Sequence, residues 1–117
     1  MGLVGIDIID ISRFDKYTDN LDSRFCRNVY TTYELAYLKT KKTASMAGLF
    51  AAKEAVAKAV GTGFRGVSPL DIEIRHTEFG APYVVLHGKA KELIKGAKIH
   101  VSISHTKTTA VAVAHLN

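Results

Sequence analysis

Three charged side chains in two separate segments have the types and spacing needed for phosphate chemistry. Asp7 lies in the middle of LVGIDIIDI, residues 3–11, an Ile- and Val-rich stretch that predicts a strand buried on both faces. Burying an unpaired carboxylate costs several kcal/mol, so Asp7 is expected to have a partner: a cation, backbone N–H groups or a metal. Glu54 and Lys58 are four residues apart, which places them on one face if their segment is helical.

The second segment, residues 47–64 (AGLFAAKEAVAKAVGTGF), predicts a long helix of mostly small residues that another element can approach closely. At about 100° per residue, Phe50, Glu54, Lys58 and Gly61 fall along one ridge, and Gly61 is expected to end the helix. Taken alone, the Glu54–Lys58 pair is most simply a solvated ion pair worth about 0.2–0.5 kcal/mol.

The combination of the two segments is more specific than either one. Asp7 and Glu54 are carboxylates without an obvious structural duty, and Mg²⁺ commonly takes one or two carboxylates together with substrate phosphates. Lys58, one turn beyond Glu54, would balance phosphate charge. These parts predict phosphoryl-type transfer, where catalysis is mostly positioning and charge neutralisation, and they leave the substrate undefined.

Other patterns in the chain carry less chemistry. Gly61–Gly66 (GTGFRG) satisfies G-x-G-x-x-G, but it follows a helix, whereas the dinucleotide motif leaves a strand and opens a helix; only a weaker phosphate contact through backbone N–H groups remains. Ser104 and His105 are neighbours in an expected strand, so a hydrolase triad is not predicted. His105 and Thr106 are expected near a hairpin tip, where donors could meet an anion, although a surface turn is the simpler interpretation. The histidines are too dispersed to predict a zinc cluster: His76, His87, His100, His105 and His115.

The elements expected to hold these residues describe one α+β domain over residues 1–117. Ser12 and Asp15 suggest a capping box, so a helix is expected to begin near Arg13, with a break around 18–21 before a second short helix. Thr31 and Glu34 form a second capping box, which opens a helix to about residue 41. Thr43 is expected to cap the central helix. The remaining expectations are a half-buried strand at 70–76, a turn at 79–82, a strand at 83–87, a helix at 88–95, and a hairpin of strands 98–104 and 108–116.

Composition and charge limit the classes of partner. The chain has 117 residues, 47% of them hydrophobic, and a net charge of +5, which indicates an acidic partner: nucleic acid, a phosphorylated ligand or an acidic protein. Cys26 is the single cysteine, which excludes an intrachain disulfide and fits a reducing cytosol. No signal sequence and no membrane-length apolar run are present, so a soluble, cytoplasmic protein without a membrane partner is expected. Four basic residues lie close together in sequence: Arg13, Lys16, Arg24 and Arg27. They form either a solvated face or a binding patch.

Across essentially its whole length the chain resembles the 4′-phosphopantetheinyl transferases, in particular the short bacterial holo-[acyl-carrier-protein] synthases. The motifs are Gly5-Ile-Asp7 with Arg13, Phe50-Ala-Ala-Lys53-Glu54-Ala with Lys58 and Gly61-Thr-Gly63, Asp71-Ile-Glu73, Gly80-x-Pro82, and Ser102-x-Ser104-His105-Thr106. The resemblance implies that coenzyme A donates its 4′-phosphopantetheine to a serine of apo acyl carrier protein, in support of fatty acid biosynthesis.

The resemblance also implies roles for individual residues. Asp7 and Glu54 would hold Mg²⁺ on the pyrophosphate, and Lys58 would neutralise developing charge. His105 and Thr106 would contact a coenzyme A phosphate. The nucleotide pocket would be shaped by Phe50, the Gly61–Gly63 turn and Gly80–Pro82, and the acidic carrier protein would dock on Arg13 and, less directly, on Lys16, Arg24 and Arg27.

The family forms trimers with sites between subunits, which implies a homotrimer here. One position departs from the family pattern: many members carry Arg directly before the Phe of F-x-x-K-E, and here that residue is Leu49. A small nucleic-acid-binding domain is the alternative from another class, but base-stacking aromatics interleaved with Lys and Arg on one sheet are absent from the pattern. An inactive scaffold is disfavoured because Asp7, Glu54 and Lys58 are all present.

Overall fold

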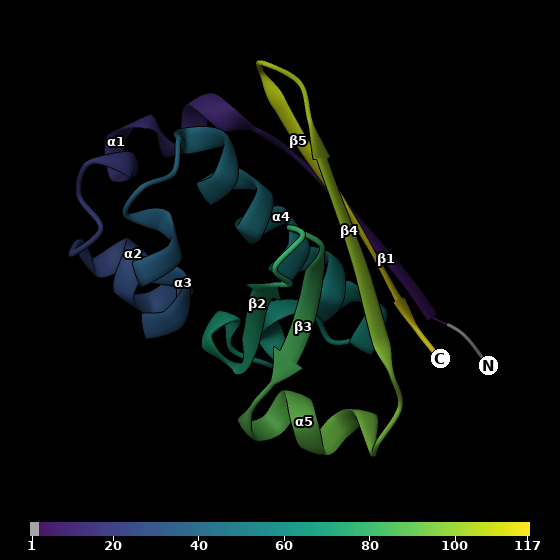
Figure 1. Cartoon of the computed structure of the whole chain (residues 1–117). Coiled ribbons are helices and arrows are strands. Elements are labelled where there is room, and N and C mark those ends of the chain that lie inside the picture. The colour runs from purple at the N-terminus through teal and green to yellow at the C-terminus, as the bar shows by residue number, and fades with distance from the viewer. Residues whose placement is uncertain (1–2) are drawn as a thin grey trace.

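The computed structural model describes residues 3–117, which fold as an α+β domain with a long central helix (Figure 1). The strands are β1 (Leu3–Asp10), β2 (Ile72–His76), β3 (Pro82–Leu86), β4 (Ile99–His105) and β5 (Thr109–Leu116). The helices are α1 (Asp15–Thr18), α2 (Arg24–Val29), α3 (Thr32–Leu38), α4 (Thr43–Val60) and α5 (Gly88–Ile94), with 3-10 turns η1 (Ile11–Phe14), η2 (Gly63–Arg65) and η3 (Pro69–Asp71). None of the described helices is long and apolar enough to cross a membrane.

The strands form two separate antiparallel sheets. The first has the order β1-β5-β4, so the N-terminal strand pairs with the C-terminal one, and Asp7 lies opposite Ala112. The expected C-terminal hairpin is confirmed as β4 and β5, with His105 opposite Ala110 at its tip. The second sheet contains only β2 and β3, paired from Ile72–Leu86 to His76–Pro82. The chain thus holds one larger sheet and one small one, with α4 beside both.

Helix α4 is the centre of the core and lies against the β1-β5-β4 sheet (Figure 1). Its small side chains permit this close approach: Ala47, Ala51, Ala55 and Ala59 are completely buried. The helix begins at Thr43, earlier than the 47–64 segment, and Thr43 does not cap it; its hydroxyl instead shares a hydrogen bond of 2.7 Å with that of Thr18. Its expected end is confirmed, because Gly61 adopts φ +98° and donates to the Ala57 and Lys58 carbonyls.

The expectation that both faces of the first strand are buried is wrong for the single chain. Gly5 and Ile9 face α4 and are buried, whereas Val4, Ile6 and Ile8 on the opposite face are 63%, 61% and 70% exposed. The helices cover only one face of the sheet. An apolar face of β1 is therefore left open to solvent.

Two local expectations near the short helices had different outcomes. The Thr31–Glu34 capping box is confirmed in both hydrogen bonds. The Ser12–Asp15 box is wrong: residues 11–14 form η1, and Ser12 makes no capping bond. Packing decides this region, since the Ile11 N–H donates to the Thr108 carbonyl at 2.9 Å and Ile11 is buried. The expected break after Thr18 is confirmed, since α1 ends there.

The observed strand differs from the one expected at 70–76 in two respects: it begins later, and a residue expected on its solvent-exposed face is buried. Residues 69–71 form η3, capped by Ser68, and β2 begins at Ile72. Ile72 and Ile74 are buried as expected, but Glu73, expected on the solvent side, is only 5% exposed. Glu73 tolerates burial because Arg75 and His87 pair with its carboxylate.

Candidate active site

A glycine brings the first strand into direct contact with the central helix. A Cβ on Gly5 would lie 1.9 Å from the Ala55 carbonyl oxygen and 2.7 Å from the Ala59 nitrogen, so no larger residue fits without moving the backbone. Asp7 follows two residues later on the same face of β1 and is therefore directed at the next turn of α4. This explains why glycine and aspartate occur together in Gly5-Ile-Asp7.

The partner that Asp7 requires is Lys58. The Lys58 Nζ lies 3.2 Å from Asp7 Oδ1 and also donates to the Ile6 carbonyl at 2.9 Å. The Asp7 side chain is 16% exposed and that of Lys58 is 48% exposed, so the ion pair lies at the edge of the core with its ammonium open to solvent. Of the partners expected for Asp7, a cation, backbone N–H groups or a metal, the structure shows a cation that lies 51 residues away in sequence.

Glu54 belongs to the same group of charges. Partial burial raises the pKa of the Glu54 carboxyl and the charge of Asp7 raises it further, whereas Lys58 and Arg13 act in the opposite direction. The four charges thus lie near enough to influence one another. Glu54 and Lys58 are also on the less buried ridge of α4, as predicted, with Phe50 and Gly61.

Two carboxylates whose charges act on each other match what a hard divalent cation uses. Asp7 and Glu54 would supply two oxygen ligands and leave the rest of the coordination shell to water and phosphate oxygens. No group of three His, Cys, Asp or Glu residues suited to a metal is found among residues 3–117. The donor set fits Mg²⁺ shared with a phosphorylated substrate better than a cation enclosed by protein alone.

The other residues expected at the ligand lie in two places. Gly61 and Gly63 are just beyond Lys58, at the same end of α4. Phe50 takes part in an aromatic cluster, with ring centroids 5.4 Å from Phe14 and 6.3 Å from Phe64.

Gly80, Pro82 and His105 line a separate hollow of about 270 Å³, together with Leu49 and His76. Leu49 and Glu54 are five residues apart, about 140° around the helix, so this hollow and the carboxylates lie on different faces of α4. Thr106 is at the hairpin tip, where its hydroxyl oxygen accepts the Thr108 and Thr109 N–H groups, and it does not line the hollow.

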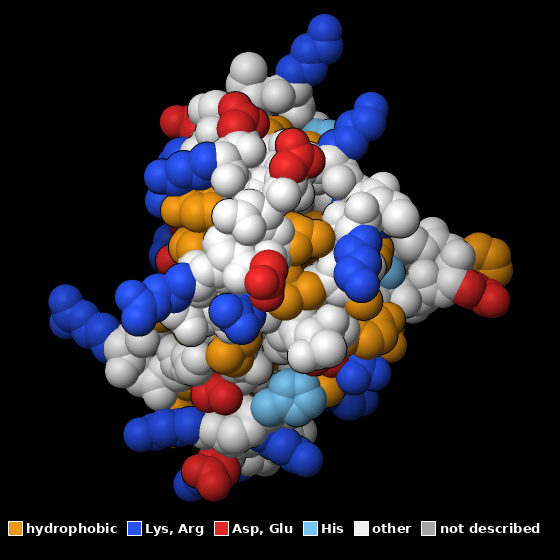
Figure 2. All heavy atoms as spheres, turned by 90° about the vertical axis from the view of Figure 1, so that its left-hand side faces the viewer, with side chains coloured by type: hydrophobic (Ala, Val, Ile, Leu, Met, Phe, Trp, Pro, Cys, Tyr) orange, Lys and Arg blue, Asp and Glu red, His pale blue; other side chains and the backbone are white. Residues whose placement is uncertain are grey.

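The basic residues are also divided. Arg13 and Lys16 border a hollow of about 210 Å³ whose apolar lining includes Tyr17 and Phe25. Figure 2 looks onto the side that carries α1, α2 and α3 and shows basic side chains around apolar ones. Arg24 and Arg27 project from α2 outside that hollow, and Arg27 lies 3.7 Å from the exposed Asp22. Of the four, Arg13 is the residue whose charge acts on the Glu54 carboxyl and lowers its pKa.

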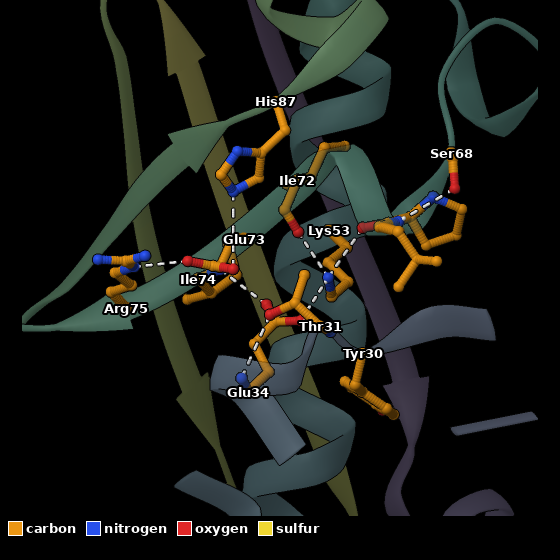
Figure 3. A network of polar contacts seen from close by, with 12 residues as sticks. Tyr30, Thr31, Glu34, Lys53, Ser68, Ile72, Glu73, Ile74, Arg75 and His87 are labelled. Atoms are coloured by element: carbon orange, nitrogen blue, oxygen red, sulfur yellow. Dashed lines mark hydrogen bonds and ion pairs between the residues drawn. The ribbon is translucent and has the colours of Figure 1, made fainter. Parts of the chain in front are cut away.

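Sequence reasoning assigned no role to a second lysine of α4. Lys53 is fully buried and lies 2.7 Å from the equally buried Glu34 (Figure 3). The capping box explained Glu34 only as a local contact within α3. A lysine in a helix stretch of otherwise buried alanines and valines was the available signal that it needed an interior partner.

Comparisons with known proteins agree with the arrangement of the chain. Residues 3–114 match the family described as the 4′-phosphopantetheinyl transferase superfamily. A holo-[acyl-carrier-protein] synthase of Halothermothrix orenii is 43% identical over 114 residues, covering 93% of this chain and 91% of the relative. The enzyme of the same name from Clostridium acetobutylicum is 43% identical, covering 97% and 94%.

Solved structures give the same assignment. Helicobacter pylori holo-[acyl-carrier-protein] synthase in complex with coenzyme A superimposes with a TM-score of 0.87 at 32% identity, covering 98% of this chain and all of the other. A holo-(acyl-carrier-protein) synthase of Bacillus anthracis in complex with CoA (3′,5′-ADP) gives 0.81 at 39% identity, covering 97% and 94%. The chain belongs to the 4′-phosphopantetheinyl transferase superfamily.

Proposed function

We propose that this protein transfers 4′-phosphopantetheine from coenzyme A to a serine of apo acyl carrier protein, releasing adenosine 3′,5′-bisphosphate, in support of fatty acid biosynthesis. The observation that carries this proposal is the convergence of Asp7, Glu54 and Lys58 between β1 and α4. The names of the relatives and the coenzyme A in the similar structures support the choice of substrates.

Asp7 and Glu54 are the residues that would hold Mg²⁺. When bound there, the ion would supply Lewis-acid polarisation of the pyrophosphate. The two carboxylates would hold it from two elements, the strand and the helix, and their mutual repulsion would favour occupation by a cation.

Lys58 is proposed to neutralise charge that develops on the phosphates during transfer. Its ammonium contacts Asp7 and the Ile6 carbonyl, but the side chain stays half exposed. It can therefore contact a substrate oxygen from its present position. A fixed cation at this place stabilises the transition state more than the ground state, because charge builds up only during the reaction.

The nucleotide end of coenzyme A is proposed to occupy the hollow with Gly80, Pro82 and His105, while Phe50, Gly61, Gly63 and Thr106 contact the rest of the donor. The hollow and the carboxylates face different sides of α4, so a complete site would combine surfaces of two copies. The open apolar face of β1 supports this arrangement and the homotrimer that it implies.

This assembly has a direct test. Ile6→Glu places a charge on the open face of β1, where the side chain is 61% exposed in the single chain. We expect the variant to sediment as a folded monomer and to lose transfer. Leu93→Glu, which places the same charge on an apolar side chain of α5 that is 43% exposed, is the matched control and should keep both assembly and activity. A wild-type monomer with full activity would overturn the shared site.

The acidic carrier protein is proposed to dock beside Arg13 and Lys16, with Arg24 and Arg27 contributing at the edge. Arg13 lies near enough to Glu54 to lower its pKa, so a carrier bound there would have its serine close to the carboxylates. The affinity of the enzyme for the carrier protein should fall as the salt concentration rises, as for other associations steered by charge.

The free, buried Cys26 is consistent with a cytoplasmic location.

Mass spectrometry of apo acyl carrier protein incubated with coenzyme A and Mg²⁺ tests the proposal. The expected result is a gain of one phosphopantetheine group that disappears with chelator. No gain with several carriers, together with salt-sensitive binding of random DNA, would favour the nucleic-acid-binding alternative instead.

A further inference from the structure

A buried ion pair between α4 and α3 also forms hydrogen bonds to the small β2–β3 sheet (Figure 3). The Lys53 Nζ is 2.7 Å from Glu34 Oε1, and it also donates to the carbonyls of Pro69, at 2.9 Å, and of Ile72. These three acceptors match the three hydrogens of an ammonium group. Lys53 is therefore fully used by the protein and has no donor left for a ligand.

Glu34 is equally engaged. One of its carboxylate oxygens accepts the Thr31 N–H at 2.8 Å, and the other accepts the Ile74 N–H at 2.7 Å. The Lys53–Glu34 pair thus touches four segments at once: the start of α3, the middle of α4, the η3 turn and β2.

These contacts matter because the β2–β3 sheet is small. It shares no strand pairing with the β1-β5-β4 sheet, and a two-stranded sheet is only marginally stable alone. Ile72 and Ile74 pack into the core, but apolar contacts have little directional preference. The hydrogen bonds from Lys53 and to Glu34 act on named backbone atoms of η3 and β2, and so fix the distance of this sheet from α4.

The same distance sets the width of the hollow described above. Gly80 and Pro82 contribute to its lining from the β2–β3 turn and the start of β3, whereas Leu49 contributes from α4 and His105 from β4. A change in how β2 is attached to α4 would move the first pair of lining residues relative to the second. Lys53 lies one turn beyond Leu49 in the same helix, at the point of attachment.

We propose that Lys53, paired with Glu34, is a positioning residue that sets the width of this hollow and thereby the affinity for the nucleotide end of coenzyme A. The inference rests on the proposed function. A stabilising role alone does not call for these residue types, because a well-packed apolar pair of similar volume is often as stable as a buried ion pair. The charged pair adds hydrogen bonds that are directional and join specific backbone atoms, which an apolar pair does not make.

The principal variant is Glu34→Gln, which keeps the volume of the side chain, and the second is Lys53→Met. Lys91→Met, an exposed lysine of α5, is the matched control. Steady-state transfer gives KM for coenzyme A and kcat, calorimetry gives the Kd for adenosine 3′,5′-bisphosphate, and hydrogen exchange follows the amides of β2 and β3. All are measured well below the melting temperature of each variant.

The expected result is a rise of about tenfold or more in KM for coenzyme A and in the Kd for the bisphosphate, because small displacements of a binding wall are costly. We expect kcat to stay within about threefold, since the carboxylates and Lys58 are unchanged. Amide exchange should quicken in β2 and β3. The control should match the wild type in every measurement.

A lower melting temperature with unchanged KM, Kd and exchange in β2 and β3 would overturn the proposal and leave the pair a purely stabilising role. If Lys53→Met does not fold, Glu34→Gln decides the question. Wild-type protein that neither binds coenzyme A nor transfers its arm would overturn the proposed function instead, and the exchange measurement, which needs no substrate, keeps the two failures apart.

Discussion

The region around Lys53 and the region around Lys58 lie on one helix and use the same residue type in opposite ways. Lys53 is fully buried, and Glu34 and two backbone carbonyls accept its hydrogen bonds. Lys58 is 48% exposed, and within residues 3–117 its ammonium contacts Asp7 and the Ile6 carbonyl. Residue type therefore does not distinguish the two roles. A lysine whose hydrogen-bond donors are all used by the protein stabilises the fold, whereas one with free donors is available to a substrate.

The carboxylates of the two regions show the same contrast. Glu34 accepts two backbone N–H groups and the Lys53 ammonium, so its charge is met inside the protein. Burial raises the pKa of both carboxyls, but at Glu34 the Lys53 ammonium and the two backbone N–H groups oppose the rise. At Glu54 the charge of Asp7 adds to it, a condition that a bound cation would relieve. The unsatisfied region is therefore the one expected to carry the chemistry.

The largest expected difference between the regions is in stability. Lys53→Met leaves the Glu34 carboxylate buried without its partner, and we expect the free energy of unfolding to fall by about 3–5 kcal/mol. Lys58→Met breaks a half-exposed pair and should cost no more than about 1 kcal/mol. Urea unfolding of both variants measures this, and equal losses would contradict the comparison.

A smaller effect is expected where β1 meets α4. Gly5→Ala would place a Cβ 1.9 Å from the Ala55 carbonyl oxygen and push Asp7 away from Lys58, at a cost of about 1–3 kcal/mol or more. Gly48→Ala is a milder control, because its Cβ would meet the Ile103 Cγ2 at 3.1 Å. Thermal unfolding should separate the two variants, and an equally stable Gly5→Ala protein would contradict the close approach of strand and helix.

The smallest effect is on titration and sharpens the description of Glu54. In metal-free protein its pKa should lie above the ordinary value of 4.5, and Asp7→Asn should lower the pKa by removing the nearby negative charge. A carboxyl with a raised folded pKa contributes stability below its unfolded pKa and loses it as pH rises through the folded value. Glu54→Gln should thus be relatively more stable, compared with wild type, at pH 7 than at pH 4. Carboxyl NMR titration checks the first point, and an unchanged midpoint in Asp7→Asn would contradict the interaction.

Local patterns in the sequence were sufficient for most of the fold. The C-terminal hairpin, the Gly61 stop and the Thr31–Glu34 capping box depend on neighbouring residues, and each is confirmed. The Ser12 box failed because a distant contact, from Ile11 to Thr108, fixes the backbone there. Propensity gives way to packing at such positions.

The residues of the candidate site could be singled out from the sequence, but the contacts between them could not. Asp7 and Glu54 stood out as carboxylates in apolar segments, yet nothing local indicates that Lys58 reaches back to Asp7. The Lys53–Glu34 pair could not be predicted for the same reason, since its two residues belong to different helices that the tertiary fold brings together. Glu73 was misplaced because its partner His87 lies in the turn before α5.

The most direct test of the account is the single-turnover rate of phosphopantetheine transfer by Glu54→Gln in saturating coenzyme A, Mg²⁺ and apo acyl carrier protein. The account predicts a fall on the order of 10²–10³-fold relative to wild type, with the variant folded and at least as stable when metal-free. A rate within a few-fold of wild type would contradict the central claim that the carboxylates between β1 and α4 carry the reaction.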